Sequence, residues 1–174
     1  MSDAMKAIRV EKLTLNMGAG TDHGAMEKAV KLLKMITGIE PVKTKTSKRV
    51  PGWGLRPGLP IGCKITLRGQ QAQQVIDRLL VALDKKLPKN AFDNDGNISF
   101  GLKEYLDIPG VKYDQSIGII GLQVTITLDR PGFRVKKRSL RKARIPLKHR
   151  IPQQEAIAFA KEQFKITLRE EDDN

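Results

Sequence analysis

The sequence predicts a fold that combines two-faced β-strands with amphipathic α-helices. Three segments, 13–18, 61–68 and 121–129, alternate apolar and polar residues at the period of a half-buried strand. Two others, 24–36 and 70–86, repeat apolar residues at helical spacing. Because each strand keeps one polar side, the pattern indicates a sheet with one buried face and one open face.

Capping residues mark where the two helices begin and end. Thr21 or Asp22 can cap the first helix, and Gly38 can end it. The second helix should close at Lys85 and Lys86, because their charges suit the negative end of the helix dipole.

Shorter signals complete the chain. The Asn-Asp-Gly run at 94–96 indicates a turn before a strand at 98–102, and 103–107 can form one helical turn. Pro152 suits the first turn of a last helix, and 165–169 can form a final strand.

Composition indicates one domain, 1–174, with a polyanionic partner. The 174 residues are 40% hydrophobic, enough for a core, and carry a net charge of +13. Such an excess favours nucleic acid or an anionic membrane as partner. No apolar run has the length of a membrane span and no signal peptide is evident, so we expect a cytoplasmic protein without a membrane partner. The single Cys63 lies on the apolar side of its strand, with Ile61 and Ile65, and is interpreted as a core residue.

A basic stretch centred on 42–69 indicates where the polyanion binds. From 41 to 76 there are seven basic residues and no acidic one. Short polar and basic side chains on a strand face can reach phosphates and 2′-hydroxyls across a shallow RNA minor groove. The candidates for this face are Thr14, Asn16, Lys43 or Lys45, Lys64, Thr66 and Arg68.

The loop at 47–60 joins the two strand-like pieces of this stretch. Three Pro and three Gly in fourteen residues leave few backbone donors for a ladder, so we expect a mobile loop. Trp53 lies at its centre, flanked by Lys48, Arg49 and Arg56. This Trp either packs on its own stem or contacts a partner.

A second basic segment covers 130–154, with ten basic residues and no acidic one. Like charges at this density repel each other unless a polyanion neutralises them. We therefore predict an irregular segment that orders partly on RNA and contacts phosphates. Its candidate contacts are Arg134, Lys136, Lys137 and Arg138. The acidic tail, 170–174, is expected to be disordered.

The sequence gives little support for an enzymatic function. The glycines at 18, 20 and 24 are one residue too widely spaced for a dinucleotide-binding turn, and no phosphate-binding loop of the Walker type exists. His23 and His149 lie far apart, each without a second metal ligand nearby. We expect no catalytic residues, no metal and no cofactor. Eight aromatic residues are also few for recognition of RNA by base stacking.

Four motifs together resemble a known family. LTLNMGAG at 13–20, ITG-x-x-P at 36–41, PIGCKITLRG at 60–69 and GLKEYLDIPGVKYD at 101–114 resemble, in order and spacing, large-subunit ribosomal protein five, the family that binds 5S rRNA. The resemblance covers nearly the whole chain. The basic 130–154 segment and the acidic tail resemble the archaeal members.

The resemblance implies an α+β domain with a largely antiparallel sheet, helices on one face and an open face that binds 5S rRNA. It implies a cytoplasmic protein in the large ribosomal subunit that anchors the central protuberance, with large-subunit rRNA and neighbouring large-subunit proteins as further partners. Asn16 and Thr66 occupy positions that the family uses against 5S rRNA, whereas Ile39 replaces its usual Gln. The 47–60 loop would contact peptidyl-site tRNA. Its contact residues would be Lys48, Arg49, Gly52, Trp53, Gly54 and Arg56.

Two rival functions remain at this point. A free-standing RNA chaperone or regulator could use the same open face. A nucleotide-dependent enzyme is the more distant alternative.

Overall fold

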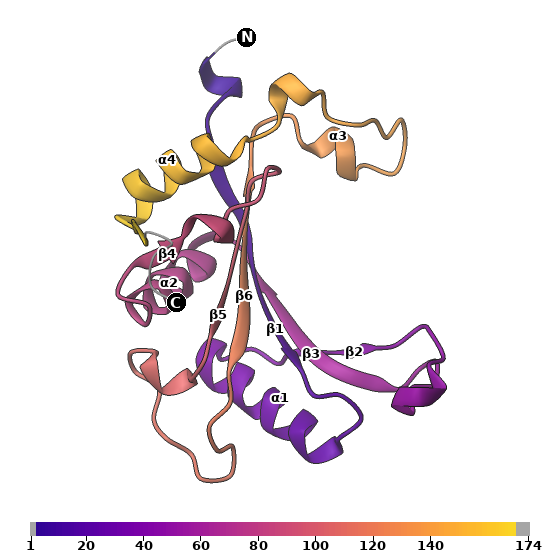
Figure 1. Cartoon of the computed structure of the whole chain (residues 1–174). Coiled ribbons are helices and arrows are strands. Elements are labelled where there is room, and N and C mark those ends of the chain that lie inside the picture. The colour runs from indigo at the N-terminus through magenta and orange to yellow at the C-terminus, as the bar shows by residue number, and fades with distance from the viewer. Residues whose placement is uncertain (1–2, 170–174) are drawn as a thin grey trace.

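The computed structural model describes residues 3–169, and its centre is a five-stranded antiparallel sheet (Figure 1). In spatial order the strands are β2 (Val42–Lys45), β3 (Pro60–Leu67), β1 (Arg9–Gly18), β6 (Leu122–Asp129) and β5 (Asn97–Leu102). The three long alternating segments of the sequence thus lie side by side in the middle of the sheet. Their apolar residues point to the same face, because paired residues share a side of the sheet.

Helices cover one face of this sheet. The helices α1 (His23–Thr37), α2 (Gly69–Val81) and α4 (Gln153–Phe164) lie on the same side of it in Figure 1. Between them and the strands lie fully buried side chains such as Leu13, Leu15 and Leu33. The predicted α+β class, with an antiparallel sheet and helices on one face, is confirmed.

The caps of α1 are confirmed as well. Asp22 accepts a hydrogen bond from the backbone N–H of Gly24 at 2.8 Å, so Asp22 rather than Thr21 is the N-cap. Gly38 ends the helix with φ 73°, and its N–H donates to the Lys34 carbonyl at 2.8 Å. That left-handed conformation is the reason a glycine is found there.

The predicted end of the second helix is wrong. α2 stops at Val81, and the chain then turns with positive φ at Asp84 and Lys85. Lys86 begins the strand β4 (Lys86–Pro88), which pairs in parallel with β7 (Thr167–Arg169). Leu87 is buried in this two-stranded sheet. The partner strand β7 lies about 80 residues further along the sequence, so local helical periodicity could not reveal the pairing.

The remaining elements are short. They are the 3₁₀ helices η1 (Asp3–Met5), η2 (Pro51–Trp53), η3 (Lys89–Ala91), η4 (Tyr105–Asp107) and η5 (Leu147–His149), and the four-residue helix α3 (Arg134–Lys137). Among residues 3–169, no helix combines the length and apolar character needed to cross a membrane. The acidic tail, 170–174, lies outside the described residues.

Candidate nucleic-acid interface

The sheet face opposite the helices carries polar side chains in transverse rows. The strand register sets Thr66, Thr14, Thr125 and Ser99 across one row, and Lys64, Asn16 and Gln123 across the next. Four residues predicted for this face from alternation alone, Thr14, Asn16, Lys64 and Thr66, therefore lie together on two adjacent strands. The face offers short hydroxyl and amide groups, with an ammonium beside them.

Hydrogen bonds between neighbouring strands orient several of these groups. The Asn16 Nδ2 donates to Gln123 Oε1 at 3.1 Å, and the hydroxyls of Ser99 and Thr125 lie 3.2 Å apart. Lys64 and Thr66 are exposed. The amide of Asn16 is thus held in place by one partner, which leaves its carbonyl oxygen and second N–H for a ligand.

The register places both candidate lysines of β2 away from the open face. Lys43 lies opposite the buried Cys63, so it belongs to the other side of the sheet and its assignment to the open face is wrong. The irregularity just before Lys45 adds Ile61 to β3 and no residue to β2, so β2 keeps its alternation and Lys45 lies on the same side as Lys43. The assignment of Lys45 to the open face is therefore wrong as well.

The same face also contains residues that sequence reasoning did not assign to the site. Lys12 and Thr127 pair across β1 and β6, one row beyond Thr14. The alternation of 121–129 indicates that Gln123, Thr125 and Thr127 face outward, but uncharged side chains give no signal of binding in the sequence. Arg68 lies exposed at the end of β3, where it precedes α2.

The 47–60 loop is an extension of the β2–β3 hairpin, and it carries its own backbone hydrogen bonds. The N–H of Thr46 donates to Leu59 at 2.9 Å, and Val50 and Leu55 form an isolated bridge. These bonds are few, as expected from the Pro and Gly content, and the mobility of the loop stays a prediction. Trp53 is 74% exposed, so it does not pack on its own stem. The tip presents a large aromatic surface to solvent.

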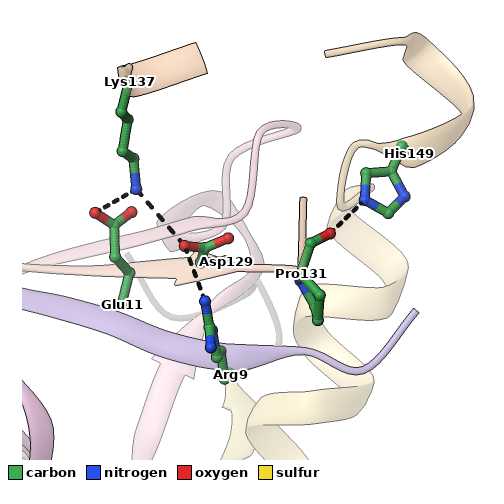
Figure 2. Close-up of polar contacts among 6 residues, drawn as sticks. All are labelled: Arg9, Glu11, Asp129, Pro131, Lys137 and His149. Carbon is green, nitrogen blue, oxygen red and sulfur yellow. Dashed lines mark hydrogen bonds and ion pairs between the residues drawn. The ribbon is translucent and has the colours of Figure 1, made fainter. Parts of the chain in front are cut away.

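The basic segment, 130–154, is fixed to the fold at both ends. The Arg130 guanidinium is buried, forms an ion pair with Glu155 and donates to the Arg150 carbonyl at 3.1 Å. Burial lowers the pKa of Arg130, because the charged form loses hydration. The His149 Nε2 lies 2.9 Å from the Pro131 carbonyl oxygen (Figure 2). Apart from α3, η5 and the start of α4 at Gln153, the segment is irregular, as predicted.

Acidic residues from outside the segment neutralise some of its charge. Lys137 Nζ lies 2.6 Å from Glu11 Oε1 and 3.6 Å from Asp129 Oδ2, where Arg9 also contributes (Figure 2). Arg150 pairs with Asp95 at 3.2 Å. Within residues 3–169, the basic side chains of the segment that form no ion pair are Arg134, Lys136, Arg138, Arg141, Lys142, Arg144 and Lys148. Of the four predicted contacts, Lys137 is the one already engaged in ion pairs.

Across the described part of the chain, no group of three or more His, Cys, Asp or Glu side chains is arranged to hold a metal ion. Cys63 is buried, and burial raises the pKa of its thiol.

Comparisons with known proteins identify the family. A model of ribosomal protein L5 matches residues 3–56, and a model of the C-terminus of the same ribosomal family matches residues 60–159. The large ribosomal subunit protein uL5 of Nanoarchaeum equitans is 44% identical over 169 residues, which cover 97% of this chain and 99% of that relative. The chain belongs to the ribosomal protein L5 family. Its resemblance to the archaeal members is thereby confirmed.

Two further L5 proteins are similar to this chain over nearly its full length. The uL5 protein of Sulfolobus acidocaldarius is 44% identical, with 97% of this chain and 94% of the relative covered. That of Methanosphaera stadtmanae is 39% identical, with 91% and 95% covered. As an L5 protein, this chain is a structural ribosomal protein and not an enzyme. The open face needs both family regions, because β1 lies in the first and its neighbours β3 and β6 lie in the second.

Proposed function

We propose that this L5 protein holds 5S rRNA on its open sheet face and so anchors the central protuberance of the large ribosomal subunit. As a family member it is a structural component of that subunit, with rRNA and ribosomal proteins as partners. The observation that carries the finer proposal is the pair of polar rows on the face opposite the helices, one centred on Thr14 and Thr66 and the other on Asn16 and Lys64.

These rows suit the minor groove of a folded RNA. An A-form helix presents 2′-hydroxyls and phosphates there, which short hydroxyl and amide side chains can reach when the strand backbones approach closely. Lys64, Lys12 and Arg68 add positive charge on or beside the face. Contacts of this kind recognise the shape of the RNA and fix its register, whereas base sequence contributes little.

The hairpin tip at 47–60 is proposed to contact peptidyl-site tRNA. Lys48, Arg49 and Arg56 are exposed on it, and Gly52 and Gly54 allow close backbone approach. A protein that must accept every tRNA can use phosphate contacts but no base readout. The exposed Trp53 supplies an aromatic surface for packing against a ribose or base.

The unpaired cations of the basic segment, 130–154, are proposed to contact phosphates of large-subunit rRNA. The ends of this segment are held by the contacts of Arg130 and His149, so only the part between them would order on binding RNA. That lowers the entropic cost of association.

Footprinting on isolated 5S rRNA tests the main proposal. With the full chain added at fixed salt, we expect protection of the backbone of one continuous helical region of 5S rRNA. Absence of protection at concentrations that shift 5S rRNA in a gel would overturn the assignment of the face. Retention on the large subunit through a high-salt wash would separate a structural component from a free-standing RNA chaperone.

A further inference from the structure

A cavity of about 400 Å³ is lined mainly by residues of the basic segment. Its apolar lining, called the floor below, consists of the buried Phe133, the half-buried Ile145 and the exposed Ala143. Cations form its rim, at Lys136, Lys142 and Arg144. The ion pair between Arg150 and Asp95 completes the wall.

Several contacts hold the walls of this cavity in place. The Ala143 N–H donates to the Val135 carbonyl at 3.3 Å, which folds the chain after α3 back over it. Phe133 packs edge-on against His149, with ring centroids 5.6 Å apart. The Asp95 carboxylate belongs to the turn between η3 and β5, so the pair with Arg150 joins two parts of the chain 55 residues apart. The cavity is therefore part of the fold.

The lining offers apolar, cationic and carboxylate contacts, and few ligands can use all three at once. An apolar floor accepts a flat ring, cations at the rim accept a phosphate, and the Asp95 carboxylate accepts a hydrogen bond from a sugar hydroxyl or a base N–H. Inorganic phosphate would use the rim alone. A nucleoside 5′-phosphate uses all three, and the volume lies within the roughly 300–1,000 Å³ typical of small-molecule sites.

We propose that this cavity receives one unstacked nucleotide of RNA, with its base on the Phe133–Ile145 floor and its phosphate on Arg144 and Lys142. The proposal rests on the proposed function in so far as the RNA is ribosomal. It changes the role of the segment, because the inserted base contributes binding that salt does not screen, whereas phosphate contacts are weakened by salt.

NMR titration of the full-length chain provides the direct test. The probes are AMP, inorganic phosphate, hexaadenylate RNA and an acidic pentapeptide, and the signals followed are the Ile145 methyls and the Ala143 amide. We expect AMP and hexaadenylate to shift both signals, and phosphate to bind more weakly and leave Ile145 unchanged. Equal binding of phosphate and AMP, tighter binding of the peptide, or no shift with any probe would each overturn the proposal.

A cavity-filling variant gives a second readout. Ala143→Trp should weaken hexaadenylate binding about tenfold while the log–log salt slope stays unchanged, because it removes base insertion and no charge. The matched control is Ala158→Trp, an exposed alanine on α4, which should bind as the parent does. If Ala143→Trp does not fold, Arg144→Ala compared with Lys148→Ala replaces it, and only the first should abolish the AMP shifts.

Different results would contradict the nucleotide cavity and the 5S rRNA role of the open face. If the 5S rRNA footprint is present and no probe shifts Ile145, the nucleotide cavity is wrong and the proposed function stands. If AMP shifts Ile145 but 5S rRNA shows no footprint, the assignment of the open face is wrong and the cavity stands.

Discussion

The Lys137 ammonium lies 2.6 Å from the Glu11 carboxylate, and this contact ties α3 to β1. The same ammonium is 3.6 Å from Asp129, whose side chain is only 8% exposed. A residue that sequence analysis assigned to RNA thus has a structural partner in the free protein. Its neighbour Lys136 forms no ion pair within residues 3–169, so the two lysines should behave differently when each is replaced.

Replacing Lys136 by Ala should flatten the salt dependence of rRNA binding, with about one unit removed from the log–log slope. Lys137→Ala should change the slope less, because part of its charge is already neutralised. It should instead lower the free energy of unfolding by about 1 kcal/mol, since Asp129 is then left with the more distant Arg9, at 3.8 Å. Salt-dependent binding and urea denaturation of both variants check this. Equal slopes and equal stabilities would contradict it.

A negative charge on the open face should weaken binding of 5S rRNA. Thr66→Glu adds a carboxylate at an exposed position opposite Thr14, in the row that continues to Thr125, and leaves the core unaltered. We expect a loss of at least a few kcal/mol at fixed salt, from repulsion of phosphate and a lost hydroxyl contact. The control is Gln73→Glu, which makes the same charge change at an exposed position on α2. Unchanged 5S rRNA affinity in a folded Thr66→Glu variant would contradict the assignment of this face.

Close approach of the backbones at Gly62 should make this residue intolerant of any side chain. A Cβ there would lie 2.6 Å from the carbonyl oxygen of Met17 and 3.1 Å from the Thr44 hydroxyl. Gly62→Ala should therefore destabilise the protein by about 2 kcal/mol, because neighbouring strands must move apart. Gly101→Ala is the control, since a Cβ at Gly101 meets no atom within 4 Å. Thermal melts of the two variants should separate clearly, and similar melting temperatures would show that the strands can move apart at little cost.

Cys63 should be unreactive in the folded protein. It is fully buried, and burial raises the pKa of its thiol, so the reactive thiolate is scarce. Labelling by a disulfide reagent at pH 8 should therefore follow unfolding. Because the pKa is higher in the folded state, stability is fully present below the unfolded value near 9 and falls as pH rises above it. Cys63→Ala should lose this alkaline slope, and fast labelling in native buffer would contradict the burial argument.

Local patterns predicted the elements that one chain segment determines by itself. Alternation identified the outward side of Thr66, and the caps of α1 followed from Asp22 and Gly38. The predictions that failed concern residues whose partners are distant in sequence. Lys86 joins a strand because Thr167 lies opposite it, and Lys137 is engaged because α3 folds onto β1.

The two lysines of β2 show the same limit within a hairpin. Alternation gives the period of a strand but not which of its sides matches the open side of its neighbour. Only the observed register, with Lys43 opposite Cys63, shows that Lys43 and Lys45 face away from Lys64. The nucleotide-sized cavity likewise depends on Asp95 meeting Arg150, which nothing in either segment indicates.

The hairpin tip should be separable from the sheet face. Deleting Val50–Gly58 would leave a three-residue connection between Thr46 and Leu59, whose backbones already pair at 2.9 Å. Loops of that length close hairpins readily, so β2 and β3 should stay paired and the open face should remain intact. We therefore expect normal 5S rRNA binding and faster release of tRNA from the peptidyl site of ribosomes that carry the deletion.

Trp53→Ala tests the aromatic side chain alone. Because Trp53 is 74% exposed, its loss should not affect folding. If the aromatic surface contributes to tRNA binding, Trp53→Ala should reproduce part of the faster release, and a phosphate-only mode would leave release unchanged. The measurements are filter binding of 5S rRNA and the dissociation rate of peptidyl-site tRNA. If the deletion abolishes 5S rRNA binding in a folded protein and spares tRNA, the roles assigned to the sheet face and the hairpin tip must be exchanged.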